Sequence, residues 1–386
     1  MRQLLSAIVL LVLLSPQAST APPLLVAPAD AGMSADKLAE GVALFRAAID
    51  KDELRNVILL VARDGQLVLH EPLGWKNVEA EQAMQTAVLL RMASNTKAVV
   101  ATAVLILAEE RKLRLDDPIG RHLPAFDNQQ YRHVTIRQLL SHTSGLRIST
   151  LFREPLMEAS DEYPDAPSLQ LEVNRFAEIG PEVKPGSSFR YNNAGYNTLG
   201  ALIEVVSGLP LEEFLEQRIY QPLNMTDTSH RPRQETAERM SVVYASKDGE
   251  WSIRFKQGTE MRVPFVRASG GLVSTTTDYL RFLQMHLDEG VYQGQRLLSR
   301  RSVRLAQKNH TIDTYTKEQQ ATRTSYYGLG WFLNTDGSYW HSGSEGTYTW
   351  VDPQRRVIGM VMSQSPGGKY MRNEFRAIVN AACLDR

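Results

Sequence analysis

The stretch that decides the fold is residues 88–110, VLLRMASNTKAVVATAVLILAEE. Residues 88–92 form a strand-like run, and residues 97–110 are apolar on nearly every side of the helix that they predict. A helix that is apolar all round must be buried. Lys97 is its only charge before Glu109, so a lysine stands at the mouth of a buried helix. This placement favours a specific role for Lys97.

Ser94 lies where the strand-like run meets this helix, three residues before Lys97. Residues three apart on a helix share a face, which would bring the serine hydroxyl and the lysine ammonium within hydrogen-bond reach. The helix N-terminus also directs unpaired N–H groups and a partial positive charge at this point. The arrangement suits acyl transfer, with Ser94 as nucleophile and Lys97 as its activating partner. On these residues alone, however, a helix-capping serine and a solvated lysine are the more common interpretation.

Strand patterns lie at both ends of the chain, and helix patterns lie between them. Asp64-Gly65 joins two β-rich runs, which is a strong hairpin signal. The expected strands are residues 57–62, 66–70, 326–332, 338–340, 348–351 and 357–363. The expected helices are residues 97–110, 136–140, 195–207, 211–220 and 277–289, with others after Ser34 and over residues 373–384.

This order of elements predicts an α+β fold, in which both ends of the chain build one antiparallel sheet flanked by helices. The sheet lobe would span about residues 33–92 and 268–386, and a mainly helical lobe about residues 93–267. The cleft between the lobes is the natural place for a site. Residues 147–168 and 230–264 look like loops that frame this cleft.

Residues 1–21 have the pattern of a secretory signal peptide. One positive charge precedes an apolar run from Leu4 to Leu14, broken only by Ser6, and small or polar residues follow up to Ala21. The run is well short of the roughly 20 residues that span a bilayer, which favours cleavage over a membrane anchor. We therefore expect a mature domain of residues 22–386, periplasmic or secreted, with no integral membrane segment. The exact cleavage position and the oligomeric state stay open.

The charge balance and the motifs of the chain exclude several classes of function. The chain has 43 Lys and Arg against 43 Asp and Glu, with no dense basic stripe, so nucleic acid is not an expected partner. Its histidines are scattered and form no HExxH or other metal-ligand spacing. There is no G-x-S-x-G, G-x-G-x-x-G or P-loop motif. The sequence therefore implies no metal and no cofactor.

Two further segments, far from Ser94 and Lys97 in the sequence, carry residues of the same kind of site. Tyr191-Asn192-Asn193 precedes the helix predicted at residues 195–207, and His341-Ser342-Gly343 ends a predicted strand. Together the three segments resemble the S-x-x-K, Y-x-N and K/H-T/S-G elements of the class C β-lactamase and penicillin-binding-protein superfamily of serine hydrolases. The resemblance extends from about residue 34 to the C-terminus. It includes residues 115–119, 135–146, 268–272 and 328–331.

The resemblance implies a β-lactamase/transpeptidase-like fold and assigns the catalytic roles. Ser94 would attack the substrate carbonyl, and Lys97 would accept or relay its proton. Tyr191 would serve as a base or as the acid for the leaving group, and which residue is the general base stays open. Tyr191 can act as a base only if its pKa falls well below about 10, which positive charge on Lys97 and His341 could achieve.

Four further positions are implied to bind substrate. Asn193 would hydrogen-bond Lys97 and the flank of the substrate. The backbone N–H groups of Ser94 and Ser344 would form the oxyanion hole, and Gly343 would let the substrate lie close to the strand. His341 stands where β-lactamases usually have lysine, which puts tight recognition of a substrate carboxylate in doubt.

His341 makes the chain resemble the DD-peptidases, D-aminopeptidases and esterases of the superfamily more than efficient class C β-lactamases. We therefore expect hydrolysis of D-amino-acid peptides or small esters through an acyl-Ser94 intermediate, with a small molecule or short peptide as the only partner. The alternatives are a β-lactamase proper and a non-catalytic penicillin-recognising receptor.

Overall fold

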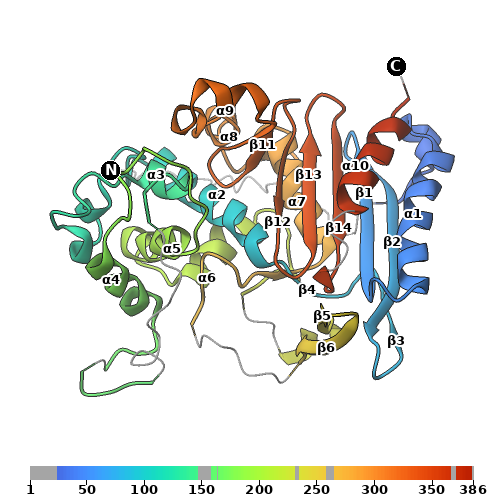
Figure 1. The fold of residues 1–386 in the computed structure, drawn as a ribbon, viewed down its shortest axis with the longest axis horizontal. Helices are drawn as coiled ribbons and strands as arrows, with labels where there is room; N and C mark the ends of the chain where they lie inside the picture. Colours follow the sequence, from blue (N-terminus) through green and yellow to red (C-terminus); the bar gives the residue numbers. More distant parts are fainter. Residues whose placement is uncertain are drawn as a thin grey trace, which may run out of the picture.

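Both ends of the chain meet in one antiparallel sheet, whose strands stand side by side to the right of centre in Figure 1. The computed structural model describes residues 24–146, 158–162, 164–230, 234–257, 265–366 and 371–384; the predicted signal peptide and residues 147–157 of the first predicted loop lie outside these ranges. The strand order is β10-β11-β12-β13-β14-β1-β2-β3. The strands are β1 (Asn56–Arg63), β2 (Gln66–Asn77), β3 (Gln82–Ala83), β10 (Ser325–Tyr327), β11 (Phe332–Asn334), β12 (Tyr339–Ser342), β13 (Thr347–Asp352) and β14 (Val357–Met362).

The sheet is buried on both faces, and β1 shows how. Every residue of β1 is buried, and successive side chains point to opposite faces. Leu59 and Val61 pack with α1 (Ala35–Asp50) and α10 (Met371–Ala382). Ile58 and Leu60 join the larger core around α2 (Thr96–Glu109) and α7 (Thr276–Leu287). The sheet is therefore the middle layer between two sets of helices (Figure 1).

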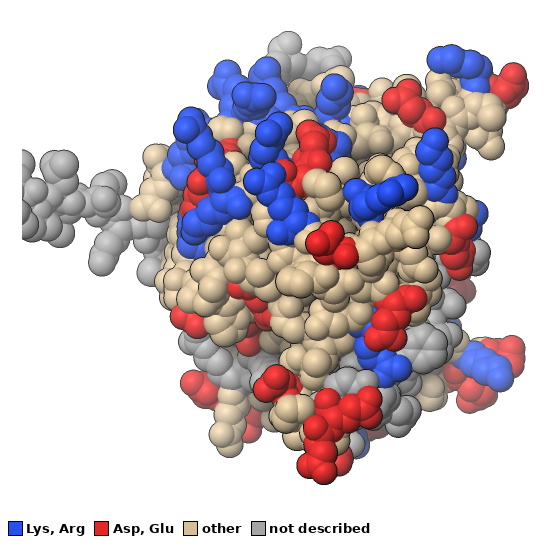
Figure 2. Space-filling model, turned by 90° about the vertical axis from the view of Figure 1, so that its left-hand side faces the viewer, with Lys and Arg blue, Asp and Glu red and all other residues tan. Residues whose placement is uncertain are grey.

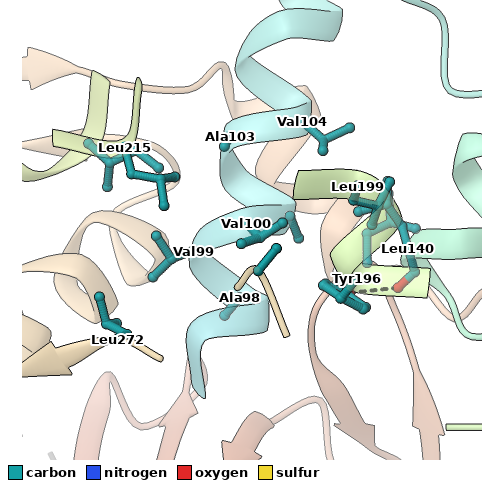
Figure 3. Close-up of a cluster of buried hydrophobic side chains, with 14 of the residues drawn as sticks. Ala98, Val99, Val100, Ala103, Val104, Leu140, Tyr196, Leu199, Leu215 and Leu272 are labelled. Atoms are coloured by element: carbon teal, nitrogen blue, oxygen red, sulfur yellow. Dashed lines mark hydrogen bonds between the residues drawn. The ribbon is translucent and has the colours of Figure 1, made fainter. Parts of the chain in front are cut away.

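Helix α2 is the centre of the larger core. All residues from Thr96 to Leu107 are buried, as its apolar sequence predicts. Figure 3 shows its side chains between α5 and the Leu215 and Leu272 side chains. Tyr196 on α5 also donates its hydroxyl to the Leu140 carbonyl at 2.8 Å. The other helices are α3 (Ile136–Leu140), α4 (Leu169–Ile179), α5 (Ala194–Ser207), α6 (Leu211–Leu215), α8 (Arg300–Ala306) and α9 (Lys317–Thr322).

Several sequence-based boundaries are wrong for physical reasons. The strand predicted at residues 326–332 is two strands, because Gly330 takes a left-handed φ of +86° between them. The helix predicted at 211–220 continues as a π-helical turn from residue 216. The loop predicted at 230–264 contains a hairpin, β5 (Val243–Lys247) and β6 (Glu250–Phe255). Helix α4 was not predicted. Two further pairs are β4 (Leu90–Arg91) with β7 (Val273–Ser274), and β8 (Val291–Tyr292) with β9 (Gln295–Arg296).

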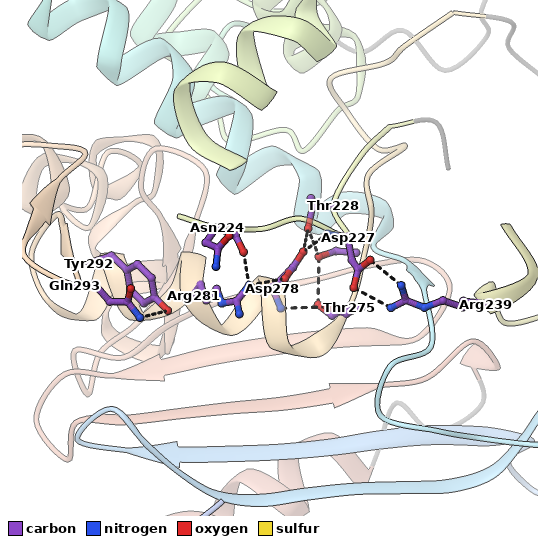
Figure 4. A network of polar contacts seen from close by, with 10 residues as sticks. Asn224, Asp227, Thr228, Arg239, Thr275, Asp278, Arg281, Tyr292 and Gln293 are labelled. Atoms are coloured by element: carbon purple, nitrogen blue, oxygen red, sulfur yellow. Dashed lines mark hydrogen bonds and ion pairs between the residues drawn. The ribbon is translucent and has the colours of Figure 1, made fainter. Parts of the chain in front are cut away.

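A buried polar network ties residues 224–239 to α7 (Figure 4). The Asp278 carboxylate accepts from the Asp227 backbone N–H at 2.8 Å and from the Thr228 hydroxyl at 3.0 Å. It also forms a buried ion pair with Arg281 at 2.9 Å. Burial nevertheless raises the pKa of Asp278 to about 6. Arg239 pairs with Asp227 at 2.7 Å, which extends the network to the surface.

The formal net charge is zero, but the charges are not spread evenly. On the face shown in Figure 2, Lys and Arg gather towards the top, and Asp and Glu lie mostly lower down. Among the helices of the described ranges, none combines the length and apolarity that crossing a bilayer requires.

Candidate active site

Ser94 lies in a tight turn that leads into α2. Strand β4 pairs with β7 and brings the chain to Ala93, which takes an uncommon left-handed φ of +46°. Residues Ala93–Asn95 form one 3-10 turn, and α2 begins at Thr96. No side chain caps either helix start, so Ser94 is not a capping serine. Its hydroxyl instead accepts a hydrogen bond from Lys97 at 3.0 Å.

Asn95, next to Ser94, fixes this turn to the sheet. Its side-chain amide donates to the Thr347 hydroxyl at 2.9 Å and to the Met92 carbonyl at 3.2 Å. Its side-chain oxygen accepts from the Thr349 hydroxyl at 3.1 Å, and its backbone carbonyl accepts from the Tyr279 hydroxyl at 3.0 Å. Sequence reasoning missed Asn95. Apart from Met92, its hydrogen-bond partners are 184 to 254 residues away, so no local pattern marks them.

Lys97 is fully buried and donates to three oxygens. These are the Ser94 hydroxyl at 3.0 Å, the Asn193 side-chain carbonyl at 2.9 Å and the Ser269 backbone carbonyl at 2.6 Å. Burial holds the pKa of Lys97 well below its usual range, and the positive charge of Arg267 lowers it further. A neutral amine in contact with a serine hydroxyl is able to accept the serine proton.

Tyr191 lies immediately before α5, and Lys97 Nζ is 4.9 Å from its ring centroid. The residue is 40% exposed, but protein surrounds its hydroxyl. This burial raises the pKa of Tyr191 above its usual value, and hydrogen bonding with Ser94 offsets only part of the rise. The condition under which Tyr191 could act as a base, a lowered pKa, is therefore not met. The two groups expected to supply positive charge, Lys97 and His341, are themselves buried with lowered pKa values.

His341 lies on β12 behind Tyr191, with 6.2 Å between the ring centroids. Its ring is fully buried, and its Nδ1 accepts from the Ser342 backbone N–H at 2.9 Å. Nδ1 also lies 3.0 Å from the Ser342 carbonyl oxygen, and Nε2 lies 3.3 Å from the Tyr327 hydroxyl. Burial, with the charge of Lys97, lowers the pKa of His341 to about 3. The imidazole is therefore uncharged at neutral pH.

His142 is a site residue that the sequence marked only as part of the fold. Its Nδ1 accepts from the backbone N–H of Asn192 at 3.3 Å, and its ring centroid is 4.4 Å from that of Tyr191. It thereby holds the segment that carries Tyr191 and Asn193. Aromatic rings surround the two histidines: Phe189, Tyr191, Tyr196, Tyr327 and Phe332.

Gly343 brings the turn after β12 against the Ser94 turn. A Cβ at this position would lie 2.6 Å from the Met92 carbonyl oxygen and 2.9 Å from the Ala93 Cβ. Only glycine permits this approach. Ser344 follows; it is exposed, and its hydroxyl donates to Glu345 at 2.6 Å. The predicted oxyanion hole draws one backbone N–H from each of these two adjoining turns.

The replacement Gly343→Ala is expected to lower kcat/KM about 100-fold, because the added Cβ must push the Ser94 turn away from the residues around it. The matched control is Gly294→Ala, in a turn where nothing lies within 4 Å of an added Cβ. Its φ of +80° predicts a loss of stability of about 1 kcal/mol without loss of kcat/KM. Ester kinetics and thermal melts check both. Equal kcat/KM for the two variants would contradict the close approach.

Within the described ranges, no group of three or more His, Cys, Asp or Glu side chains is arranged to hold a metal ion. The polar groups around Ser94 are instead an amine, a phenol, an amide and backbone atoms. The structure brings together Ser94, Lys97, Tyr191, Asn193 and His341, and places Gly343 and Ser344 in the adjoining turn.

Known proteins resemble this chain in sequence along most of its length. Protein Rv1367c of Mycobacterium tuberculosis is 27% identical over 356 residues, which cover 83% of this chain and 88% of that protein. Protein flp of Staphylococcus aureus is 25% identical over 304 residues, which cover 77% of this chain and 56% of that protein.

Solved structures share the fold. EstCE1, described as a hydrolase with promiscuous acyltransferase activity, matches with a TM-score of 0.74 and 21% identity, over 89% of this chain and 98% of that chain. The octameric penicillin-binding protein homologue from Pyrococcus abyssi matches with a TM-score of 0.73 and 24% identity, over 89% and 77%. These matches confirm the α+β, β-lactamase/transpeptidase-like fold. A sequence model of the family described as "Beta-lactamase" matches residues 42–382, so the chain belongs to the Beta-lactamase family.

Proposed function

We propose that this protein is a serine hydrolase that cleaves ester or amide bonds through an acyl-Ser94 intermediate. The observation that carries the proposal is the contact of 3.0 Å between the Ser94 hydroxyl and the amine of Lys97, a lysine whose pKa burial holds well below its usual range. Family membership supports the same chemistry, because proteins of this fold are mostly serine hydrolases.

The acylation step follows from these positions. The neutral amine of Lys97 takes the Ser94 proton while Ser94 Oγ bonds to the substrate carbonyl carbon. Backbone N–H groups of Ser94 and Ser344 stabilise the oxyanion. The bond to the leaving group then breaks, and the Tyr191 hydroxyl supplies the proton that this group needs. A raised pKa suits Tyr191 to be the acid, and the Lys97 ammonium afterwards returns its proton to the tyrosinate.

Deacylation reverses the direction of the proton transfers. Water attacks the acyl carbonyl carbon, Lys97 accepts the proton of the water, and Ser94 Oγ leaves and is protonated again. The net reaction is hydrolysis of one ester or amide bond. Asn193 holds Lys97 in place during both steps through the hydrogen bond of 2.9 Å.

We propose that the preferred substrates are small esters or D-amino-acid peptides that carry no carboxylate beside the scissile bond. His341 stands where β-lactamases usually have a lysine, and its imidazole is uncharged and buried. The Nζ atom of Lys97 already contacts three oxygens, so this tetrahedral nitrogen has no position left for a carboxylate. The partly exposed ring of Tyr191 stacks on Phe332, with 5.9 Å between the centroids, which favours apolar groups here.

A substrate panel tests this proposal. The kcat/KM for short-chain p-nitrophenyl esters should exceed that for nitrocefin at least about 100-fold. This ratio corresponds to a difference of about 2.7 kcal/mol in transition-state binding. D-alanyl peptides with a free or an amidated C-terminus measure the effect of a carboxylate directly. Faster nitrocefin turnover would favour a β-lactamase proper, and stable penicillin acylation without turnover would favour a receptor.

Export to the periplasm or medium is also a proposal, and it rests on residues 1–21 alone. Its test is mass-spectrometric sequencing of the N-terminus of the protein produced in a bacterial host with an intact secretion system.

A further inference from the structure

Behind Lys97, a continuous chain of polar groups leads away from the substrate side. The Ser269 carbonyl accepts from Lys97 at 2.6 Å, and the backbone N–H of the same residue donates to the Asn197 side chain at 3.0 Å. Asn197 donates in turn to a Glu172 carboxylate oxygen at 3.0 Å. The other oxygen of Glu172 accepts from Arg267 at 2.8 Å. Three contacts therefore connect a buried ion pair to the amine of Lys97.

The Glu172–Arg267 pair is deep in the helical part of the molecule. The exposed fraction is 2% for the Glu172 side chain and 15% for the Arg267 side chain. Helix α4 carries Glu172, and α5 carries Asn197 one turn after Asn193, the other amide that contacts Lys97. The network thus joins two helices and the loop before β7. Because unpaired buried charges are costly, each member depends on the next.

Arg267 of this pair also acts on Lys97 through its charge. Arg267 lowers the pKa of Lys97 through its positive charge. The other titratable groups that interact with Lys97 are Tyr191 before α5, Tyr196 on α5, His142 after α3 and His341 on β12. Burial keeps all four uncharged at neutral pH.

We propose that Glu172, Asn197 and Arg267 are positioning residues, which aim the Ser269 carbonyl at Lys97 and balance the charge around its amine. The proposal rests on the proposed function, in which neutral Lys97 is the base. The side chain of Asn197 fixes the peptide of Ser269 by accepting a hydrogen bond from its backbone N–H. Glu172 holds Asn197 in orientation and offsets the charge of Arg267. None of the three needs to touch the substrate.

The charge balance predicts that Glu172→Gln and Arg267→Gln shift the pH dependence of kcat/KM in opposite directions. The acid limb of kcat/KM reports the pKa of the base in the free enzyme. Glu172→Gln removes the negative charge that pairs with Arg267, which disfavours the lysine cation further, so the limb should move to lower pH by about one unit. Arg267→Gln removes the positive charge, so the limb should move to higher pH by a similar amount. The double variant should return close to the wild-type limb.

Two control variants separate this effect from loss of structure. Arg267→Lys keeps the charge and should leave the limb in place even if the fold is weakened. Glu110→Gln removes a carboxylate that pairs with Arg218 at the far end of the helix of Lys97, 13 residues or about 20 Å away, and should not move the limb. Thermal melts of every variant report folding. If Glu172→Gln fails to fold, the contrast between Arg267→Gln and Arg267→Lys carries the test.

Asn197→Ala tests the positioning of the carbonyl. We expect kcat about 10- to 100-fold lower with KM within about twofold, because the lost hydrogen bond acts on Lys97 and not on bound substrate. The same pH series is followed with a fluorophosphonate, whose rate of Ser94 labelling depends on the base but not on deacylation.

The outcomes separate the two proposals. A wild-type protein with neither ester turnover nor Ser94 labelling would reject the proposed function itself. A wild-type protein with a clear acid limb, but with Glu172→Gln and Arg267→Gln limbs that coincide with it or move in the same direction, would overturn the positioning role and leave the function standing. Opposite shifts that cancel in the double variant support the network.

Discussion

Ester turnover by Ser94→Ala is expected to fall at least about 10,000-fold, to the level of the uncatalysed reaction in buffer. A loss of this size corresponds to about 5.5 kcal/mol of transition-state stabilisation. The reason is that no other hydroxyl can replace Ser94. Its Oγ is the one held at 3.0 Å from the buried amine of Lys97, in a turn that Asn95 and Thr347 fix to the sheet.

The matched control is Ser187→Ala. Ser187 is exposed, and its hydroxyl donates to the Lys184 backbone carbonyl rather than to an amine. Its loss should leave kcat/KM within about twofold of the wild type, as is usual for a surface substitution. Initial rates on a p-nitrophenyl ester, with melting temperatures measured in parallel, decide the result. A Ser94→Ala protein that keeps more than about 1% of the wild-type rate would show that another group is the nucleophile.

Lys97→Met is expected to lower kcat about 1,000- to 10,000-fold while the protein remains folded. Methionine fills a similar volume, but it cannot accept the Ser94 proton. The variant loses the hydrogen bonds that Lys97 donates to Asn193 and to Ser269, which lowers stability. It also removes a buried polar amine, which offsets this loss, so the melting temperature should change by only a few degrees. Activity and stability therefore respond differently to this change.

Lys97→Arg distinguishes a base from a simple cation. Arginine keeps the positive charge but stays protonated at all accessible pH values, so it cannot act as a base. We expect Lys97→Arg to be as inactive as Lys97→Met. If the arginine variant instead kept about a tenth or more of the wild-type kcat, Lys97 would act through its charge, and the base would have to be sought elsewhere.

The local part of the site was predictable from the sequence. Ser94 and Lys97 are three residues apart in one helical turn, so the spacing alone brings their side chains together. The burial of α2 followed from its apolar sequence. Tyr191, Asn193 and His341 could be found only through the resemblance to a family, because nothing in their own segments says that they meet Ser94.

What depends on long-range packing was not predictable. The Ser269 carbonyl accepts from Lys97 across 172 positions of the chain, and a backbone carbonyl leaves no mark in the sequence. Whether the pKa of Tyr191 is lowered, as a base would require, could not be decided from the sequence, because burial is set by tertiary structure. Helix α4, which carries Glu172, did have a signal: Ser168 caps it, and Leu169, Val173 and Phe176 recur at helical spacing.

The most direct test of the central claim is the mass of the labelled tryptic peptide after reaction with a fluorophosphonate. Cleavage after Arg91 and Lys97 releases residues 92–97, MASNTK, which contain one serine. The account predicts one adduct per molecule, located on this peptide at Ser94, and no adduct in the Ser94→Ala protein. An adduct on any other peptide of the wild type, or full labelling of Ser94→Ala, would contradict it.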